Sequence, residues 1–594
     1  MLLWAAAWVL EFVMGLWPLN LFLYPFYFVV AEALFHFHTK KYLREQSASP
    51  HQTRVDDADT AAVLAFWTWI LGSGENDAPA LEALLRGWFL HDDGTAASEA
   101  EVCRGNLAAF VAWTLYNCDE PEELSAERRA TIYRIVDDVE GALGRTLSPG
   151  RDPTLRTMTY TVGDLEPCYK PLLYYLALQT VHAAVHAVLR LRGFRWRRAG
   201  RLRYLVRPAC ASLQRPPPPP PPPLVLMHGV GGLLPYLGLL WRMADHHDGA
   251  VLVPYFGVCA IAAPPAVRRA AAAAPLPTAE LVAAIEAMVI RHAAPGGPPR
   301  AAFLAHSLGT AFLASVVKGA PASVGAAAFV DPICFLLHHP AVVHNFLYRP
   351  ASCPPAPLRR AASANADAFP VELKRQPTWE HSPPRGKRRH APALAAPSVG
   401  RHLVHACMRL LVTTEPTIQA CFRRAFWWSQ HWLHPAELPC GTLVHLSASD
   451  TVAEAAPVYE FLRAWRRRRR HSGGSAAARP TLEVEMHDGW HHGWLCLVPA
   501  AQRRLIARLQ RLLAASRPLK EWPGLGGTNA AAADWSVGNI GGGGATTKAE
   551  AAAVARLREE ETATSLFSDT SSAHGDGEAS DASEHFVYTP GALG

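Results

Sequence analysis

The chain has 594 residues, of which 50% are apolar and 18% are charged, and its formal net charge at pH 7 is +6. A chain of this length can bury a large core without disulfide or metal staples. The small net charge excludes a strongly basic nucleic-acid-binding protein, so we expect no nucleic-acid partner. The 11 cysteines are odd in number and include no CxxC pair, which argues against a disulfide framework and a zinc ribbon.

An uncharged run at residues 12–31 predicts a membrane anchor. The run is long enough to cross a hydrocarbon layer of about 30 Å. Basic residues at 40–44 follow it, and the positive-inside rule then places the rest of the chain in the cytosol. Pro18 and Pro25 make a monotopic hairpin an alternative to a single crossing, and a buried helix of a soluble domain is a third interpretation. A lipid-droplet or endoplasmic reticulum membrane is compatible with these topologies.

Residues 46–192 show apolar positions at three- and four-residue spacing, which predicts a helical N-terminal region. The last of these helices carries His182 and His186, which are four residues apart. No third ligand accompanies them, so we interpret both as packed side chains and expect no metal site.

Short apolar runs alternate with helical patterns from residue 193 onward, which predicts a mostly parallel sheet covered on both faces. A hairpin precedes six such runs, which lie at 224–230, 250–257, 301–307, 326–332, 442–449 and 481–487. The long stretch between the fourth and fifth runs predicts an inserted lid. We therefore expect an anchor at 1–45, a helical region at 46–192, a two-part α/β core at 193–332 and 441–514, a lid at 333–440, and a disordered acidic tail at 515–594.

The sequence AHSLG at 305–309 predicts a nucleophile elbow, because it lies between an apolar strand pattern and a helix pattern. The tight turn needs small residues two positions before and two after Ser307, and Ala305 and Gly309 stand there. We interpret His306 as a packed residue under the turn.

A second motif, HGVGG at 228–232, follows the first of the six runs. Glycines let the main chain approach a substrate closely, so that N–H groups can stabilise an oxyanion. We expect the amides of Val230 and Leu308 to form this oxyanion hole. The spacing fits neither GxGxxG nor GxxxxGK, which argues against a phosphate-binding loop.

Together, HGVGG, AHSLG and the DPICFLLH element at 331–338 resemble the α/β-hydrolase fold superfamily, and within it lipase- and esterase-like membrane-anchored serine hydrolases. The resemblance covers residues 194–513. It implies an α/β fold and a triad whose members follow in the order serine, acid, histidine.

The resemblance implies Asp450 as the acid, since it follows the strand before the last one, with Asp331 as the alternative. The base comes after the last strand, where His492 before Gly493 fits best and His491 is the reserve. His487 is assigned to the strand itself.

We thus expect a membrane-attached serine hydrolase in which Ser307, His492 and Asp450 cleave an apolar acyl ester, such as an acylglycerol, without a cofactor. The alternative is a catalytically inactive hydrolase-fold scaffold or adaptor at a membrane. The sequence identifies no protein partner.

Overall fold

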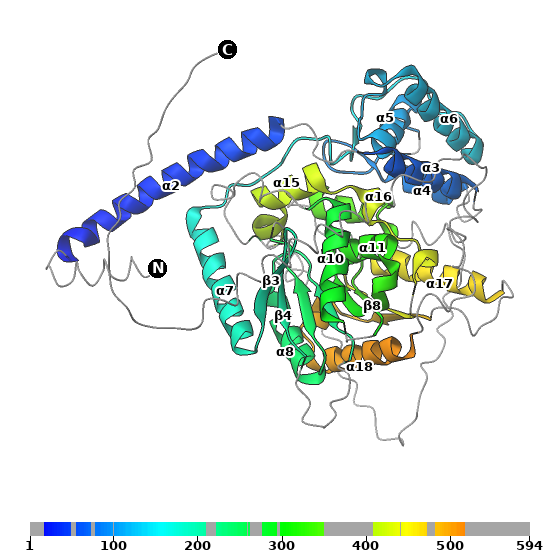
Figure 1. The fold of residues 1–594 in the computed structure, drawn as a ribbon. Helices are drawn as coiled ribbons and strands as arrows, with labels where there is room; N and C mark the ends of the chain where they lie inside the picture. Colours follow the sequence, from blue (N-terminus) through cyan, green and yellow to red (C-terminus); the bar gives the residue numbers. More distant parts are fainter. Residues whose placement is uncertain are drawn as a thin grey trace, which may run out of the picture. The chain divides into compact units, whose positions relative to one another are not determined.

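The computed structural model describes residues 17–48, 55–72, 78–98, 100–209, 221–257, 259, 261, 276–293, 297–349, 408–439, 441–471 and 481–516 (Figure 1). Residues 1–16 of the predicted anchor, the middle of the predicted lid and the acidic tail beyond residue 516 lie outside them.

The centre of the fold is an eight-stranded sheet with the order β10-β9-β8-β7-β5-β6-β4-β3. The strands β5 to β10 pair in parallel, and the hairpin β3–β4 joins β6, the last strand of this parallel part, in antiparallel orientation. This confirms the predicted, mostly parallel sheet. The strand bounds are Arg195–Ala199, Leu202–Arg207, Leu224–Met227, Val251–Pro254, Ala301–His306, Val324–Val330, Gly441–Ser447 and Leu482–His487 for β3 to β10.

Helices cover both faces of the sheet, as fully apolar parallel strands require (Figure 1). Alternate residues of β5 belong to different cores: Val225 and Met227 lie in the core that includes α10 and α11, whereas Leu224 and Leu226 lie in the core that includes α8 and α18. The bounds of these helices are Leu237–His246 for α8, Thr278–His292 for α10, Leu308–Gly319 for α11 and Pro499–Ala515 for α18. Helix α17, Ala455–His471, packs beside β9 and β10 at the opposite edge from the hairpin.

The N-terminal region is helical, with a short antiparallel pair β1–β2. Its elements are α3 (Asp57–Gly72), α4 (Ala78–Arg86), β1 (Phe89–Leu90), α5 (Arg104–Tyr116), η1 (Pro121–Glu123), α6 (Ala126–Leu143) and β2 (Arg156–Thr157). It contacts the segment between β8 and β9: the indole N–H of Trp88 donates to the carbonyl of His338 at 3.2 Å, and the rings of Phe66 and Trp428 lie 5.1 Å apart.

The segment between β8 and β9 contains short helices on either side of its undescribed middle. They are η5 (Cys334–Leu336), α12 (Pro340–Val343), η6 (His344–Tyr348), η7 (Arg409–Thr413), α15 (Pro416–Ala425), α16 (Trp428–His431) and η8 (Pro435–Glu437). The carboxylate of Glu415 caps α15 by accepting from the amides of Thr417 and Ile418, and it also accepts a 2.7 Å hydrogen bond from the hydroxyl of Tyr175. We name this segment the insert; its role as a lid stays a prediction.

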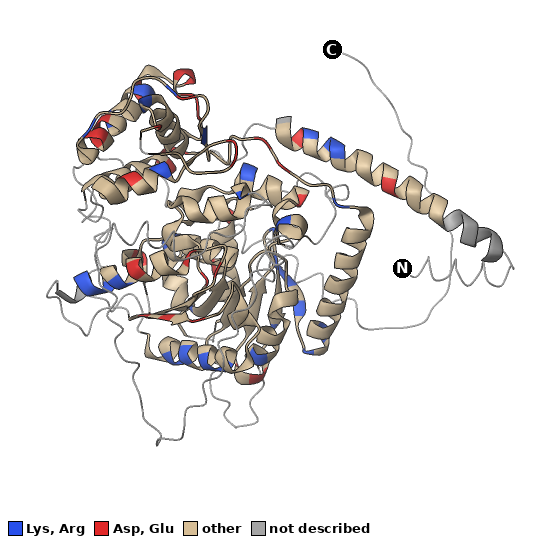
Figure 2. Cartoon of the chain, turned by 180° about the vertical axis from the view of Figure 1, so that it is seen from behind, with Lys and Arg blue, Asp and Glu red and all other residues tan. Residues whose placement is uncertain are grey.

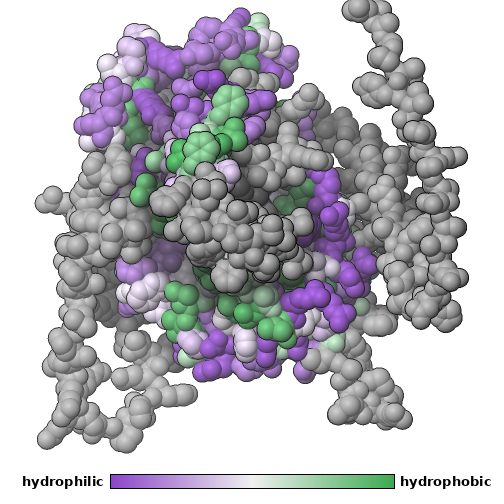
Figure 3. All heavy atoms as spheres, turned by 90° about the vertical axis from the view of Figure 1, so that its left-hand side faces the viewer, coloured by the Kyte–Doolittle hydropathy of each residue, from purple (hydrophilic) through white to green (hydrophobic). Residues whose placement is uncertain are grey.

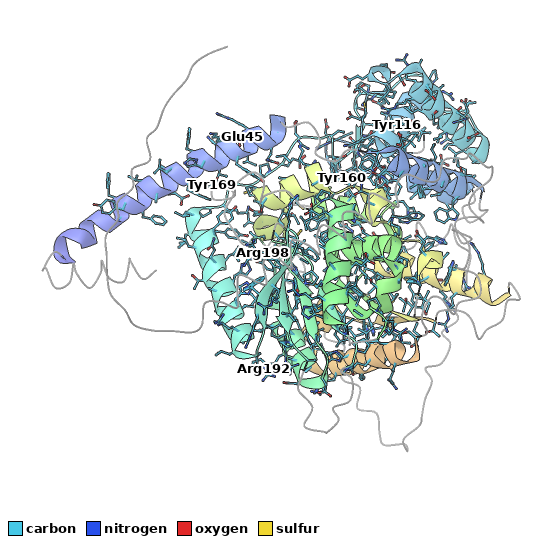
Figure 4. The ribbon with its side chains drawn as sticks, viewed as in Figure 1. Glu45, Tyr116, Tyr160, Tyr169, Arg192 and Arg198 are labelled. Atoms are coloured by element: carbon cyan, nitrogen blue, oxygen red, sulfur yellow. The ribbon has the colours of Figure 1, made fainter. Side chains whose placement is uncertain are left out.

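Helices α2 (Trp17–Ala48) and α7 (Leu172–Leu191) are joined by polar contacts. Glu32 of α2 accepts from the amide of Leu172 at 2.9 Å and from the hydroxyl of Tyr169, a side chain that points toward α2 in Figure 4. Helix α2 continues through Pro25. Among the described residues, α7 is the helix that is long and apolar enough to cross a membrane.

Candidate active site

Ser307 occupies a strained turn between β7 and α11. Its φ is 54° and its ψ is −125°, a conformation that costs a non-glycine residue about 1–3 kcal/mol. Gly309 is required there because a Cβ at this position would lie 2.1 Å from the carbonyl oxygen of Met227 in β5. Ala305 is fully buried within β7, so the sheet accommodates its methyl group two positions before the serine.

Three predicted residues meet at this turn although they lie far apart in the sequence. His492 Nε2 lies 2.9 Å from Ser307 Oγ, and His492 Nδ1 lies 2.6 Å from Asp450 Oδ2. The carboxylate favours the Nδ1–H tautomer, which leaves Nε2 free to accept from the serine hydroxyl. The loops after β9 and β10 supply Asp450 and His492, and Asp450 Oδ1 is held by the amides of Val452 and Ala453 at 2.7 and 3.0 Å.

The electrostatics of this group favour a charged histidine. Burial alone lowers the pKa of His492, but the charge and hydrogen bond of Asp450, with a contribution from Asp331, raise it to about 9. The Asp450 carboxylate thus stabilises the imidazolium form of His492.

The two alternative residues lie beside the triad rather than in it. Asp331, at a φ of 45°, accepts from the amides of Ser447 and Gly493 at 2.8 and 2.7 Å and so ties the end of β9 to the residue after His492. Burial raises its pKa to about 6. His491 Nδ1 lies 3.2 Å from the carbonyl of Ser449, and its ring packs against Trp494.

The loop after β5 is held by a neutral histidine. Burial lowers the pKa of His228 to about 4, its Nδ1 lies 2.8 Å from the carbonyl of Gly229, and its Nε2 accepts from the amide of Phe256 at 3.1 Å. Val230, Ser307 and Leu308 line one cavity, which brings the two predicted oxyanion residues to the serine. Their role as the oxyanion hole stays a prediction.

A network that the sequence did not indicate links this loop to the elbow. The Tyr236 hydroxyl accepts from the amide of Gly229 at 2.8 Å and shares a hydrogen bond with His306 Nδ1 at 2.6 Å. The His306 ring lies 5.0 Å from that of His492, and its Nε2 is 3.9 Å from Asp331 Oδ2. His306 is therefore packed under the turn, and through Tyr236 it also connects the loop after β5 to the group of Ser307, His492 and Asp450.

Comparisons with known proteins give no match to a family model and none to a curated protein. Among solved structures, a membrane phospholipase A is 14% identical with a TM-score of 0.33, covering 57% of this chain and 93% of its own. A proline iminopeptidase from Mycobacterium smegmatis is 15% identical with a TM-score of 0.32, and the match covers 54% of this chain and 99% of the iminopeptidase. A carboxylesterase from the thaumarchaeon Nitrososphaera gargenis is 11% identical with a TM-score of 0.30, and the match covers 54% of this chain and 99% of the carboxylesterase.

These similarities are low, and the deciding observation is the architecture itself: a nucleophile elbow on a parallel sheet, with serine, acid and histidine in that chain order. The chain has the α/β-hydrolase fold. In this hydrolase fold, the elbow, the acid loop and the histidine loop all lie at the carboxyl ends of the strands.

The site around Ser307 opens on an apolar cavity with about 470 Å³ of empty space, solvent at its mouth included. The insert supplies most of its wall, and Tyr160, labelled in Figure 4, comes from the N-terminal region. The lining residues besides Val230, Ser307 and Leu308 are Tyr160, Ile333, Leu337, Val342, Val343, Phe346, Leu347, Phe422, Phe426 and Val452. The sequence predicted an apolar lid but not which residues face the serine.

The two histidines of α7 are packed. The His182 side chain is buried, and the His186 ring lies 5.1 Å from Trp196 and 5.9 Å from Tyr255. Two other groups of potential ligands occur among the described residues: His306, Asp331 and His492 at the triad, and His445, Glu485 and His487 at the sheet edge.

Proposed function

We propose that this chain is a membrane-attached serine hydrolase that cleaves an apolar acyl ester, with lipid esters of the acylglycerol type as the substrate class. The main support is the hydrogen-bonded chain from Asp450 through His492 to Ser307, at the wall of an apolar cavity. Because the fold alone fixes no reaction, the proposal depends on this site.

The chemistry follows from the positions of the three side chains. Ser307 Oγ attacks the ester carbonyl carbon while His492 Nε2 takes its proton, and Asp450 stabilises the imidazolium. The oxyanion accepts hydrogen bonds from the amides of Val230 and Leu308. When the intermediate collapses, His492 returns the proton to the leaving alcohol. Water then attacks the acyl-enzyme with His492 as base, and the carboxylic acid is released. No cofactor enters these steps.

The cavity supports an apolar acyl group as the part of the substrate next to Ser307. Phe346, Phe422 and Phe426 of the insert line it, and among the described lining residues only Ser307 and Tyr160 carry a hydroxyl group. A polar acyl group would lose its hydration there without gaining partners, whereas an alkyl chain gains from burial.

The surface of α7 supports attachment to a membrane. One face of α7 packs on the core through Tyr175, Val185 and Leu189, which fits a helix lying on a bilayer better than one crossing it. Figure 2 shows that α7 carries almost no charge along its length, and Figure 3 shows apolar patches on this side of the molecule. Exposed apolar side chains occur on α7 at Leu173, Leu176 and Val181 and on α2 at Phe26, Tyr27, Phe28, Val29, Val30, Leu34 and Phe37. We propose that this face meets the cytosolic side of a lipid-droplet or endoplasmic reticulum membrane.

The experiment that tests the activity compares p-nitrophenyl esters of short and long fatty acids, followed by diacylglycerol in mixed micelles. The full chain in detergent should hydrolyse long-chain esters faster than short-chain ones, and Ser307→Ala should abolish hydrolysis. A folded wild type that hydrolyses none of them would favour the inactive scaffold.

The membrane proposal has a separate test, flotation of the full chain with phosphatidylcholine vesicles. Replacing Leu173 and Leu176 with Glu should reduce the floated fraction. The control is Gln179→Glu, which adds a charge on the same helix at an exposed polar position. Equal flotation of all three proteins would contradict the docking role of α7.

A further inference from the structure

Three side chains with metal-ligating atoms converge at the edge of the sheet, on strands β9 and β10. The parallel register sets His445 of β9 opposite Glu485 of β10, and His487 lies two residues further along on the same face as Glu485. His445 Nδ1 lies 3.0 Å from His487 Nε2 and 3.5 Å from Glu485 Oε2. All three ligand atoms lie within 4.8 Å of one another.

These spacings are those of ligands around one small cation. With metal–ligand distances of about 2.1 Å, two ligands of a tetrahedral zinc ion are about 3.4 Å apart. The two measured separations, 3.0 and 3.5 Å, lie on either side of this value. The His445 ring nitrogen thus faces an imidazole nitrogen and a carboxylate oxygen at the same time.

The neighbouring groups hold the three side chains in this orientation. Arg508 of α18 binds Oε1 of Glu485, which leaves Oε2 facing the histidines. The ring of Trp490 stacks on His487 at 4.3 Å and 15°. Support of this kind from outer-shell residues is typical of protein metal sites, where it fixes the ligand orientation.

The local charges are also compatible with a cation. Arg504 and Arg508 lie near the cluster, and Glu483 and Glu485 offset their charges, with Arg508 bound to both carboxylates.

We propose that His445 Nδ1, His487 Nε2 and Glu485 Oε2 bind a divalent transition-metal ion of the zinc type, with water as the fourth ligand. Two imidazoles and one carboxylate favour zinc over magnesium or calcium, which take oxygen ligands. This ion has no part in the proposed hydrolysis. It fastens β9 to β10 next to the loop of Asp450, where the carbonyl of His487 accepts from the amide of Ala448 at 3.0 Å.

The test uses the full chain after treatment with a chelator and dialysis. Titration with Co²⁺ should give the visible absorption bands of a four-coordinate site at one equivalent, and Zn²⁺ should displace the cobalt and raise the melting temperature. The variants His445→Ala and His487→Ala should each weaken zinc affinity at least about tenfold. Glu485→Gln keeps the side-chain volume and should also weaken zinc binding.

Two matched variants make the result specific. His91→Ala removes a histidine that lies 3.3 Å from Glu101 but belongs to neither group of three potential ligands among the described residues, and it should leave zinc affinity unchanged. His306→Ala probes the other cluster, at the triad, and should also leave it unchanged. Failure of the folded wild type to bind either ion would overturn the proposal. So would binding that survives His445→Ala and disappears with His306→Ala. Because the readout is metal binding, the proposal stands or falls independently of the hydrolase activity.

Discussion

Replacing Asp450 with Asn should change both the rate at which Ser307 reacts and the pH at which it becomes reactive. In the wild type, the opposing effects on His492 raise its pKa from 6.5 to about 9, with Asp450 as the main cause of the increase. At about 1.4 kcal/mol per pKa unit, this is about 3 kcal/mol of preferential stabilisation of the imidazolium. A protonated His492 cannot accept the serine proton, so reactivity should rise with pH until about 9.

In Asp450→Asn, the carboxylate charge is gone and burial becomes the largest influence, so the pKa of His492 falls toward or below its ordinary value. The Asn side chain can keep the oxygen that accepts from the amides of Val452 and Ala453, so we expect the loop to stay folded. Loss of the imidazolium partner should lower the maximal rate by about 10³- to 10⁴-fold.

The assay is the second-order rate constant for labelling by a fluorophosphonate, measured from pH 5 to pH 10, because it needs no knowledge of the substrate. The wild-type rate constant should rise with pH with an apparent pKa well above 6.5. In Asp450→Asn, the rate constant should rise with a lower apparent pKa. An apparent pKa at or below 6.5 in the wild type, or the same apparent pKa in the variant, would refute this reasoning.

Three further outcomes follow. Because the pKa of His492 is raised in the folded state, protonated His492 contributes fully to stability below pH 6.5, and this contribution is lost as the pH rises through about 9. Denaturant titrations between pH 6.5 and 9 should therefore show a larger loss of stability in the wild type than in Asp450→Asn. Gly309→Ala should destabilise the fold by about 3 kcal/mol or more in the same titrations, because the new methyl group would lie 2.1 Å from the Met227 carbonyl oxygen. The control Gly238→Ala, whose methyl group would have its nearest neighbour at 3.6 Å, should be neutral or slightly stabilising. Equal effects of the two substitutions would contradict the close approach of β5 and α11. Phe422→Leu enlarges the cavity and should shift the ratio of kcat/KM values toward bulkier acyl groups by about tenfold, and an unchanged ratio would place the acyl group elsewhere.

The sheet and the elbow could be predicted because their sequence signals are local. Parallel strands buried on both faces are short apolar runs, and each of β5 to β10 overlaps one of the predicted runs. The turn at Ser307 needs a glycine where α11 meets β5, so Gly309 is visible in the sequence. The structure brings Ser307, Asp450 and His492 together, and their catalytic roles remain predictions.

The hydrogen bonds around the site and the choice between the two candidate acids could not be predicted, because they depend on contacts between distant residues that leave no local sequence pattern. Tyr236 and His306 are 70 positions apart, and neither has a neighbour that marks the hydrogen bond between them. The same is true of Glu32, whose carboxylate on α2 caps the first turn of α7. The sequence also offers Asp331 as an acid, because an aspartate that follows a strand has the same sequence pattern whether its carboxylate faces a histidine or two backbone amides.

The central claim is that Ser307 is a nucleophile activated by His492, and fluorophosphonate labelling followed by peptide mass spectrometry tests it most directly. We predict that the wild type carries the label on Ser307 and that Ser307→Ala and His492→Ala do not react. Ser315→Ala is the matched control: Ser315 also hydrogen-bonds a histidine, His431 at 2.9 Å, but it lies outside the site, so labelling should persist. Labelling that survives Ser307→Ala, or a folded wild type that takes up no label, would contradict the account.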